Sequence, residues 1–364
     1  MRIQELYIKN FRNLEENKYN FNNNINYIYG QNAQGKTNLL ESIWMLTGAR
    51  SFRHSKDGEL INFNNDFASI KAKVVINNNL NNITVNFGNN KRKVFLNEVP
   101  MRSPSEIIGF FKVVLFSPLN LNLIKDGPDN RRRLIDSALC QLYITYTKIL
   151  VKYTKLLKHR NMLLKNYKNY DYKFLETLDE ELCRTGSSII MYRLDYLERL
   201  KIKSQKIYSE ISNNQEKLDI NYNFYKMNIN KISEVRSMLL DGMRKNFDLD
   251  IRLGYTSIGP HKDDIEIFIN NKPAKNYGSQ GQQRSIILSL KLAESEITEL
   301  EYGVSPVILL DDVMSELDSY RQEYLLTKIL NKQVFITGCD ELLLEKYNNN
   351  SNINKLHINC GKLI

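Results

Sequence analysis

Eight residues near the start of the chain have the types and spacing of a phosphate-binding loop. The stretch reads Gly30-Gln31-Asn32-Ala33-Gln34-Gly35-Lys36-Thr37 and fits the pattern G-x-x-x-x-G-K-[ST] at every fixed position. Glycines allow backbone amides to converge on phosphate oxygens, Lys36 would reach the β- and γ-phosphates, and Thr37 would offer its hydroxyl to a magnesium ion. We therefore predict a nucleotide site here; a purely structural glycine turn is the alternative.

The segments on either side of this loop have the patterns of a strand and a helix. Residues 25–29 form a short apolar run into the loop, and residues 38–46 carry apolar side chains at helical spacing. A helix that begins directly after the loop would point its positive end at a bound anion. The order of strand, loop and helix is therefore the one that a phosphate site requires.

Two more residues that could do chemistry follow an apolar run late in the chain. Residues 307–310 are typical of a central parallel strand, and Asp311 and Asp312 come directly after them. A carboxylate at the carboxyl end of such a strand lies beside the phosphate loop of its neighbour, so we predict that Asp311 helps to hold magnesium. Asp312 would orient or deprotonate the attacking water, with Lys36 as the second catalytic residue.

The composition limits the class of protein. Lys and Arg number 51 against 41 Asp and Glu, which gives a formal charge of +10. This charge fits a polyanionic partner, most naturally nucleic acid, although basic charge that only aids solubility is the alternative. Cysteines and histidines lack the spacing of a zinc site or a disulfide framework. Without a secretory signal or a bilayer-spanning run, we expect a cytoplasmic protein with no membrane partner.

Changes of periodicity indicate two kinds of structure along the chain. Period-two runs between 67 and 96 predict an antiparallel meander, whereas 146–167 and 173–212 predict two long amphipathic helices joined by a polar turn at 166–171. We predict three domain segments: 1–126 as the first half of a head, 127–235 as an inserted helical lobe, and 236–364 as the second half of the head.

Clusters of basic residues are candidates for contacts with DNA. Arg53 and Lys56 lie in the segment after the first helix, and Lys91, Arg92 and Lys93 lie in a turn of the meander. Solvated loops are the alternative for both clusters. The run 131–133 lies where a helix should begin, and ion pairs with Asp129 and Asp136 are the favoured explanation of these arginines.

The motifs together resemble an ABC-type ATPase head, and the wider pattern resembles the RecF family of bacterial recombination mediators. The resemblance covers nearly the whole chain and rests on Phe11-Arg12-Asn13, Asn32, VLFSP (114–118), GPDNRRRLID (127–136), LLKHRNMLLK (156–165), SIGPHKDD (257–264) and GSQGQQRS (278–285). It implies an α/β P-loop ATPase head of the SMC kind, with a parallel core sheet, an antiparallel meander and an inserted α-helical lobe. The implied cofactors are ATP and Mg²⁺.

The resemblance also implies roles for further residues. Arg12 joins the nucleotide-binding residues, and Ser315 and Asp318 form the D-loop of the S-x-L-D motif. A signature loop would complete the nucleotide pocket of a second subunit in an ATP-dependent homodimer; its residues are Ser279, Gln280, Gly281, Gln282 and Arg284. A serine hydroxyl and exposed amides at the start of the helix predicted for 285–296 suit a γ-phosphate held elsewhere.

The family's activity is implied in the same way. Closure of the dimer would form a basic cleft for single-stranded, gapped and duplex DNA, and slow hydrolysis would reopen it. RecR and RecO would be partners in loading RecA. Three departures stand out. Leu119-Asn120 replaces the usual acidic residues, the strand predicted for 334–337 ends without the histidine of transporter ATPases, and Asp312 replaces the glutamate usual in those ATPases.

Three rival interpretations of the motifs are weaker. A transporter ATPase subunit would lack the long basic helical insertion, and its phosphate loop would usually have a small residue where Asn32 stands. A nuclease-associated ATPase would need a further acidic metal-binding domain after Thr337. A DNA-binding protein in which hydrolysis has lapsed is opposed by the intact set Lys36, Thr37, Asp311 and Asp312.

Overall fold

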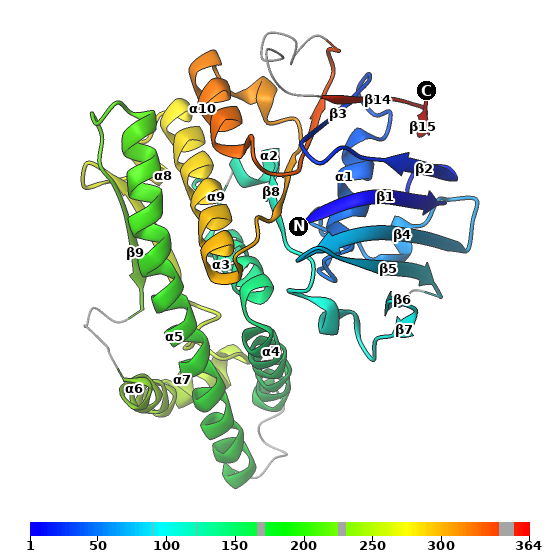
Figure 1. The fold of residues 1–364 in the computed structure, drawn as a ribbon. Coiled ribbons are helices and arrows are strands. Elements are labelled where there is room, and N and C mark those ends of the chain that lie inside the picture. The colour runs from blue at the N-terminus through cyan, green and yellow to red at the C-terminus, as the bar shows by residue number, and fades with distance from the viewer. Residues whose placement is uncertain (90, 122, 166–171, 225–230, 342–352) are drawn as a thin grey trace. The chain divides into compact units, whose positions relative to one another are not determined.

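The computed structural model describes all residues except 90, 122, 166–171, 225–230 and 342–352 (Figure 1). The chain divides into two compact units. Unit 1 comprises Met1–Asn122, Lys206–Gln215 and Ser279–Ile364, and unit 2 comprises Leu123–Gln205 and Glu216–Gly278. Among the described residues, no helix is both long and apolar enough to cross a membrane.

An antiparallel sheet forms one layer of unit 1. Its order is β2-β1-β4-β5-β6-β7, with bounds Arg2–Lys9 (β1), Asn17–Asn20 (β2), Phe67–Ile76 (β4), Asn79–Gly88 (β5), Lys91–Leu96 (β6) and Val99–Pro100 (β7). The period-two pattern of residues 67–96 reflects one buried and one more exposed face of these strands. The predicted meander is confirmed.

A second sheet of unit 1 is parallel except at its last strand. Its order is β15-β14-β3-β13-β12-β8, with bounds Ile25–Tyr29 (β3), Val113–Phe116 (β8), Val307–Leu310 (β12), Val334–Gly338 (β13), Asn354–Asn359 (β14) and Lys362–Leu363 (β15). Strand β12 pairs with β13 and β8, and all four of its residues are buried, as expected for a central parallel strand with both faces covered. The strands predicted at 25–29 and 307–310 are confirmed.

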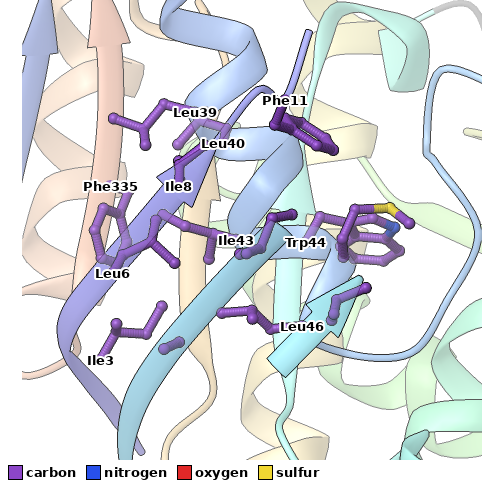
Figure 2. Packing of buried hydrophobic residues seen from close by; sticks show 14 of the residues in the cluster. Ile3, Leu6, Ile8, Phe11, Leu39, Leu40, Ile43, Trp44, Leu46 and Phe335 are labelled. Atoms are coloured by element: carbon purple, nitrogen blue, oxygen red, sulfur yellow. The ribbon is translucent and has the colours of Figure 1, made fainter. Parts of the chain in front are cut away.

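Helix α1 (Lys36–Met45) joins the two sheets of unit 1 through its apolar side chains. Figure 2 shows Leu39, Leu40 and Ile43 beside Leu6 and Ile8 of β1 and Phe335 of β13. The same buried cluster includes Ile3, Phe11, Trp44 and Leu46. Burial of this apolar surface is the main term that holds the helix in place. The orientation of the phosphate loop, which directly precedes α1, is therefore fixed by the core.

Among the described residues of unit 1, further helices are α2 (Pro118–Leu121), α9 (Gln280–Tyr302) and α10 (Ser319–Ile329), with short 3₁₀ helices at Asp57–Leu60, Pro104–Ile107 and Met314–Glu316. Helix α9 begins earlier than the predicted 285, so most of the predicted signature loop is its first turn. The departure at Leu119-Asn120 lies in α2, where Asn120 Oδ1 accepts a hydrogen bond from the Ser117 amide at 2.9 Å.

Unit 2 contains the long helices and a small sheet of order β11-β10-β9. The bounds are Pro128–Leu142 (α3), Ile144–Lys165 (α4), Tyr172–Ile211 (α5), Leu218–Asn223 (β9), Ile232–Lys245 (α6), Phe247–Leu253 (α7), Asp264–Ile269 (β10), Lys272–Pro273 (β11) and Ala274–Tyr277 (α8). The last residues of α5, from Lys206, belong to unit 1.

Helices α4 and α5 form the predicted antiparallel pair (Figure 1). Lys152 pairs with Glu181 at 2.6 Å, and Arg160, further along α4, pairs with Asp179, which lies earlier on α5. Partners that lie later on α4 and earlier on α5 are expected for helices that run in opposite directions. The polar turn predicted at 166–171 lies outside the described residues.

The observed division differs from the predicted three segments. We predicted that the head resumes at residue 236, whereas residues 236–278 lie in unit 2. Strand β10 pairs along its whole length with β9, and α7 packs against α4. These pairings join segments far apart in sequence, so composition alone did not reveal the boundary near Ser279.

Two arginines at the start of α3 have internal partners. Arg131 makes two hydrogen bonds with the carboxylate of Asp264, at 2.8 and 2.9 Å, and Arg132 pairs with Asp129. The predicted ion pairing is therefore confirmed for Asp129, while the partner of Arg131 lies on β10. A bidentate contact of this kind fixes the arginine in place.

Asp136, the second predicted partner of these arginines, pairs instead with Arg193 of α5 at 2.9 Å. Arg193 also donates to the carbonyl of Pro260 at 2.6 Å, in the motif SIGPHKDD. The motif thus organises the interior of unit 2. At Gly259, φ is 129° and a Cβ would lie 2.5 Å from the Tyr153 hydroxyl, which explains the glycine.

His261 of this motif is held in its neutral form. Its Nε2 lies 3.0 Å from the carbonyl oxygen of Thr256 and donates to it, so Nδ1 accepts the 2.6 Å hydrogen bond from the Tyr153 hydroxyl. Burial lowers the pKa of His261 to about 4. Burial raises the pKa of the nearby Asp263 carboxyl to about 6. A raised carboxyl pKa favours the folded state as the pH falls, whereas a lowered histidine pKa disfavours it.

We expect His261 to make unit 2 sensitive to acid. Because the folded-state pKa of His261 is about 4 and the unfolded value is 6.5, the unfolded chain binds more protons between these pH values, and stability is lost as the pH falls through that window. Between pH 7 and pH 4.5, the free energy of unfolding of the wild type should fall by about 2–3 kcal/mol more than that of His261→Gln, as measured by urea unfolding. The contribution of Asp263 is common to both proteins and cancels; parallel stability curves would contradict the prediction.

Candidate nucleotide site

Both fixed glycines of the phosphate loop have backbone conformations that other residues rarely adopt. Gly30 has φ 149° and Gly35 has φ 115°. A Cβ at Gly30 would lie 2.2 Å from the carbonyl oxygen of Ile358, and one at Gly35 would lie 2.8 Å from Oδ1 of Asn13. The turn between β3 and α1 therefore requires glycine at both positions.

The ammonium group of Lys36 lies inside the loop. Its Nζ donates to the carbonyl oxygens of Gly30 at 2.6 Å and Gln31 at 2.9 Å, and the residue is 7% exposed. The Sγ of Cys339, at the end of β13, lies 3.7 Å from the same nitrogen. A cation held at the centre of the loop is positioned to meet phosphate oxygens there.

The remaining loop residues are braced by the segments that follow β13 and β14. Asn32 Oδ1 accepts from the thiol of Cys339 at 3.0 Å, and the side chain of Gln34 accepts from the amide of Cys360 at 2.5 Å. Ala33 has a left-handed φ of 65°. Gln31 is exposed, so it contributes its carbonyl to Lys36 while its side chain stays at the surface.

Asp311 reaches the phosphate loop from the end of β12. Its Oδ1 accepts a hydrogen bond from the Thr37 hydroxyl at 2.8 Å. We had assumed that β3 and β12 are neighbouring strands. They are not, because β13 lies between them. The carboxyl ends of all three strands still meet at one edge of the sheet, as expected for a ligand site in a parallel sheet.

The environment of Asp311 favours a bound cation. The side chain is 5% exposed, and burial raises the pKa of its carboxyl, while the hydrogen bonds from Thr37 and Thr337 oppose that shift. A hydroxyl and a carboxylate oxygen are ligands that Mg²⁺ accepts, and this ion commonly completes its shell with water and substrate phosphates. Thr37 and Asp311 therefore fit a magnesium ion that arrives with a nucleotide.

Asp312 and the D-loop follow directly. Asp312 has a left-handed φ of 54°, and its carbonyl accepts from the Ser315 hydroxyl at 2.8 Å. Asp318 is the N-cap of α10, since its side chain accepts from the Arg321 amide at 2.9 Å. Ser315 and Asp318 thus set the path of the chain from the paired acids to α10.

The signature residues open helix α9. Ser279 is the N-cap, and it forms a capping box with Gln282 in which the Ser279 hydroxyl accepts from the Gln282 amide at 3.2 Å. Ser279 and Gln280 are exposed. Arg284 pairs with Glu316 in the segment after Asp312, so the signature helix and the D-loop are joined within unit 1.

Arg12, predicted to bind nucleotide, has a protein partner. Its Nε and Nη2 donate to the carboxylate of Glu41 at 2.9 and 3.1 Å, and Nη2 also donates to Ser55 at 2.6 Å. Glu41 is fully buried on α1, one turn after Thr37. A role of Arg12 at the nucleotide stays a prediction, and it would require the guanidinium to use its remaining donors.

The basic candidates for DNA contacts lie in different environments. Lys56, Lys91 and Lys93 are exposed, and the side chain of Arg53 is 43% exposed although it bonds to Asn38. Arg92 differs: its side chain is 6% exposed, it donates to the Ala49 carbonyl, and burial lowers its pKa. Residues 91–93 lie at the start of strand β6 and not in the turn that we predicted, and a contact of Arg92 with DNA stays a prediction.

Three polar residues of the site were missed. They are Glu41, which anchors Arg12, Thr337, which bonds to both acids, and Cys339, which touches Asn32 and Lys36. A polar side chain inside an apolar run is the one signal that the sequence offered. Glu41 in 38–46 and Thr337 in 334–337 both have it, whereas Cys339 has none.

Comparisons with known proteins identify the class of this head. A family model described as "RecF/RecN/SMC N terminal domain" matches residues 2–360. The fold is also similar to an Smc head domain from Pyrococcus furiosus, with a TM-score of 0.57 at 16% identity over 100% of this chain and 95% of that one. The predicted fold is confirmed: the molecule is an α/β ATPase head of the SMC type with a helical insertion.

More similar relatives narrow the class to one family. The chain is 42% identical over 342 residues to the "DNA replication and repair protein RecF" of Thermoanaerobacter sp. (strain X514), covering 93% of this chain and 94% of that protein. A solved structure of "the recombination mediator protein RecF-ATP in RecFOR pathway" has a TM-score of 0.91 at 38% identity, with 100% and 96% coverage. The chain belongs to the RecF family of DNA replication and repair proteins.

Proposed function

We propose that this chain is an ATP-dependent DNA-binding protein of recombinational repair and replication-fork maintenance in the cytoplasm. The observation that carries the proposal is the 2.8 Å contact between Thr37 of the phosphate loop and Asp311 at the end of β12. It joins the two halves of a nucleotide site from segments 274 residues apart. The relative whose structure is described as RecF-ATP supports ATP as the nucleotide.

Within this site, each residue has a proposed role. The amides of residues 30–37 and the ammonium of Lys36 would bind the phosphates, and Thr37 and Asp311 would hold Mg²⁺, which would neutralise phosphate charge. Asp312 orients the attacking water or accepts its proton. The aspartate side chain is shorter than that of glutamate and is positioned less well for water, so Asp312 suits slow hydrolysis that resets a switch.

A second copy of the chain would complete the site. Ser279 is exposed, and its hydroxyl accepts from Gln282 while its own proton stays available for donation to a γ-phosphate. The N-terminus of α9 adds the positive end of a helix dipole. ATP bound by one subunit and contacted by Ser279 of the other would therefore hold a homodimer together.

The closed dimer would bind single-stranded, gapped and duplex DNA and act with RecO and RecR in loading RecA. A relative is named as a recombination mediator in the RecFOR pathway, which supports these partners. The formal charge of +10 and the exposed Lys56, Lys91 and Lys93 support a polyanion.

Calorimetry of ATP binding tests the nucleotide site. We expect the wild type to bind ATP with a higher affinity in Mg²⁺ than in EDTA, because Thr37 and Asp311 add ligands to the metal. No heat of binding under either condition would remove the proposal. Equal affinities would remove the metal role of Asp311 while leaving the phosphate loop.

DNA binding should depend steeply on salt. If phosphate contacts dominate, each Lys or Arg that neutralises a phosphate adds about −0.9 to the slope of log affinity against log salt for duplex DNA. We expect Lys56→Ala to reduce the slope by about 1, and the buried Arg92→Lys to leave it unchanged. Fluorescence anisotropy between 50 and 200 mM salt measures both slopes, and a flat dependence for the wild type would rule out the basic-surface model.

A further inference from the structure

One buried hydroxyl contacts both acids of the nucleotide site. Thr337, on β13, is 1% exposed, and its Oγ1 lies 3.1 Å from Oδ1 of Asp311. The same oxygen accepts a hydrogen bond from the backbone amide of Asp312 at 2.8 Å. A hydroxyl has one proton and two lone pairs, so it can donate to Asp311 and accept from Asp312 at the same time.

The contact with Asp312 lies where strand pairing ends. The amide of Asp311 still donates to a backbone carbonyl, that of Phe116 on β8, at 2.9 Å. The next amide, that of Asp312, has the Thr337 hydroxyl as its acceptor, and φ at this residue is 54°. Non-glycine residues adopt such a φ infrequently, so a contact that holds the amide stabilises the turn.

The contact with Asp311 sets the position of its carboxylate. Oδ1 accepts from Thr37 at 2.8 Å and from Thr337 at 3.1 Å, so hydroxyls from α1 and β13 hold one oxygen from two elements. A carboxylate held in this way has little freedom to rotate, and a metal ligand that is already oriented loses less entropy when the metal binds.

We propose that Thr337 is the positioning residue of the site: its hydroxyl orients the Asp311 carboxylate toward Mg²⁺ and holds Asp312 in the turn from which it acts on water. The inference rests on the proposed function and deepens it. It assigns part of the metal dependence of nucleotide binding to a residue that acts through Asp311.

Two substitutions at this position separate the hydroxyl from the shape of the side chain. Thr337→Val removes the hydroxyl and keeps a branched side chain, whereas Thr337→Ser keeps the hydroxyl. A matched control is Thr298→Val on α9, since Thr298 is 5% exposed and its hydroxyl donates to the Glu294 carbonyl at 2.8 Å, away from the acids. All three proteins are compared as full chains, with thermal unfolding of each recorded first.

The readout is the ratio of ATP affinities in Mg²⁺ and in EDTA, measured by calorimetry. Thr337→Val should lower that ratio by about tenfold or more and leave the affinity in EDTA within about twofold. Thr337→Ser should restore most of the ratio, and Thr298→Val should match the wild type. In steady-state hydrolysis, Thr337→Val should lower kcat more than it raises KM, because Asp312 acts in the chemical step.

An unchanged ratio in Thr337→Val would overturn the inference, as would an equal loss of affinity in Mg²⁺ and EDTA. If Thr337→Val does not fold, Thr337→Ala is judged by the same ratio. If neither folds, failure of Thr337→Ser to keep the wild-type ratio overturns the inference. A wild type that binds no ATP in Mg²⁺ or in EDTA would instead contradict the proposed function itself. Equal wild-type affinities in the two conditions would overturn only this inference, because Asp311 would then have no metal role.

Discussion

Lys36→Ala should abolish detectable ATP binding. The ammonium is 7% exposed at the centre of the phosphate loop, and each hydrogen bond that a charged group makes to a ligand contributes about 1.5–3 kcal/mol. Loss of two such bonds corresponds to a decrease in affinity on the order of 100-fold or more. Calorimetry with ATP and Mg²⁺ measures the change.

The control for Lys36→Ala is Lys56→Ala, which removes an exposed lysine from the same unit. We expect that variant to bind ATP as the wild type does. Thermal unfolding of the nucleotide-free proteins checks that both variants are folded. Retention of wild-type ATP affinity by folded Lys36→Ala would show that the loop is not the nucleotide site.

Ser279→Arg should block ATP-dependent dimerisation while each monomer still binds ATP. The residue is exposed at the N-terminus of α9, and arginine would introduce bulk and an uncompensated positive charge at the proposed interface. Loss of the N-cap costs about 1 kcal/mol of stability, too little to unfold the chain. Light scattering with ATP and Mg²⁺ should report a dimer for the wild type and a monomer for the variant.

Ser233→Arg provides the matched control, because Ser233 is exposed on α6 of unit 2 and the substitution adds the same bulk and charge. It should dimerise as the wild type does. Calorimetry should give Ser279→Arg an ATP affinity within about threefold of that of a wild-type monomer. A Ser279→Arg dimer of normal mass would remove Ser279 from the interface.

Much of the site could be predicted because local sequence determines it. The backbone of the phosphate loop requires glycine at positions 30 and 35 because of their φ angles, and both glycines can be recognised in the sequence. The run at 307–310 is apolar because β12 is buried on both faces, and the acids follow where the strand ends. Patterns of this kind depend on residues that are close in the chain, so they can be recognised without knowledge of the fold.

What could not be predicted depends on contacts across long sequence separations. Strand β13 lies between β3 and β12, and nothing in 334–337 indicates that Thr337 would face Asp311. Arg92 has the composition of a surface cluster, yet its guanidinium reaches the Ala49 carbonyl 43 residues away. Basic side chains have long apolar stems and can be buried where a carbonyl accepts their hydrogen bonds.

The boundary between unit 2 and unit 1 near Ser279 could not be predicted for the same reason. Residues 236–278 contain no composition change that separates them from the second half of the head. Their place in unit 2 follows from the pairing of β9 with β10, which is antiparallel and joins Leu218 to Ile269. The family resemblance predicted an inserted helical lobe, whereas the pairing of β9 with β10 determines where that lobe ends.

Fluorescence anisotropy of labelled gapped DNA tests the central claim that ATP controls DNA binding through a dimer. The wild type and Ser279→Arg are each titrated with ATP, with ADP and without nucleotide, all in Mg²⁺. We expect tight binding only for the wild type with ATP. Binding that is equally tight in all three conditions, or in Ser279→Arg with ATP, would contradict an ATP-gated dimer.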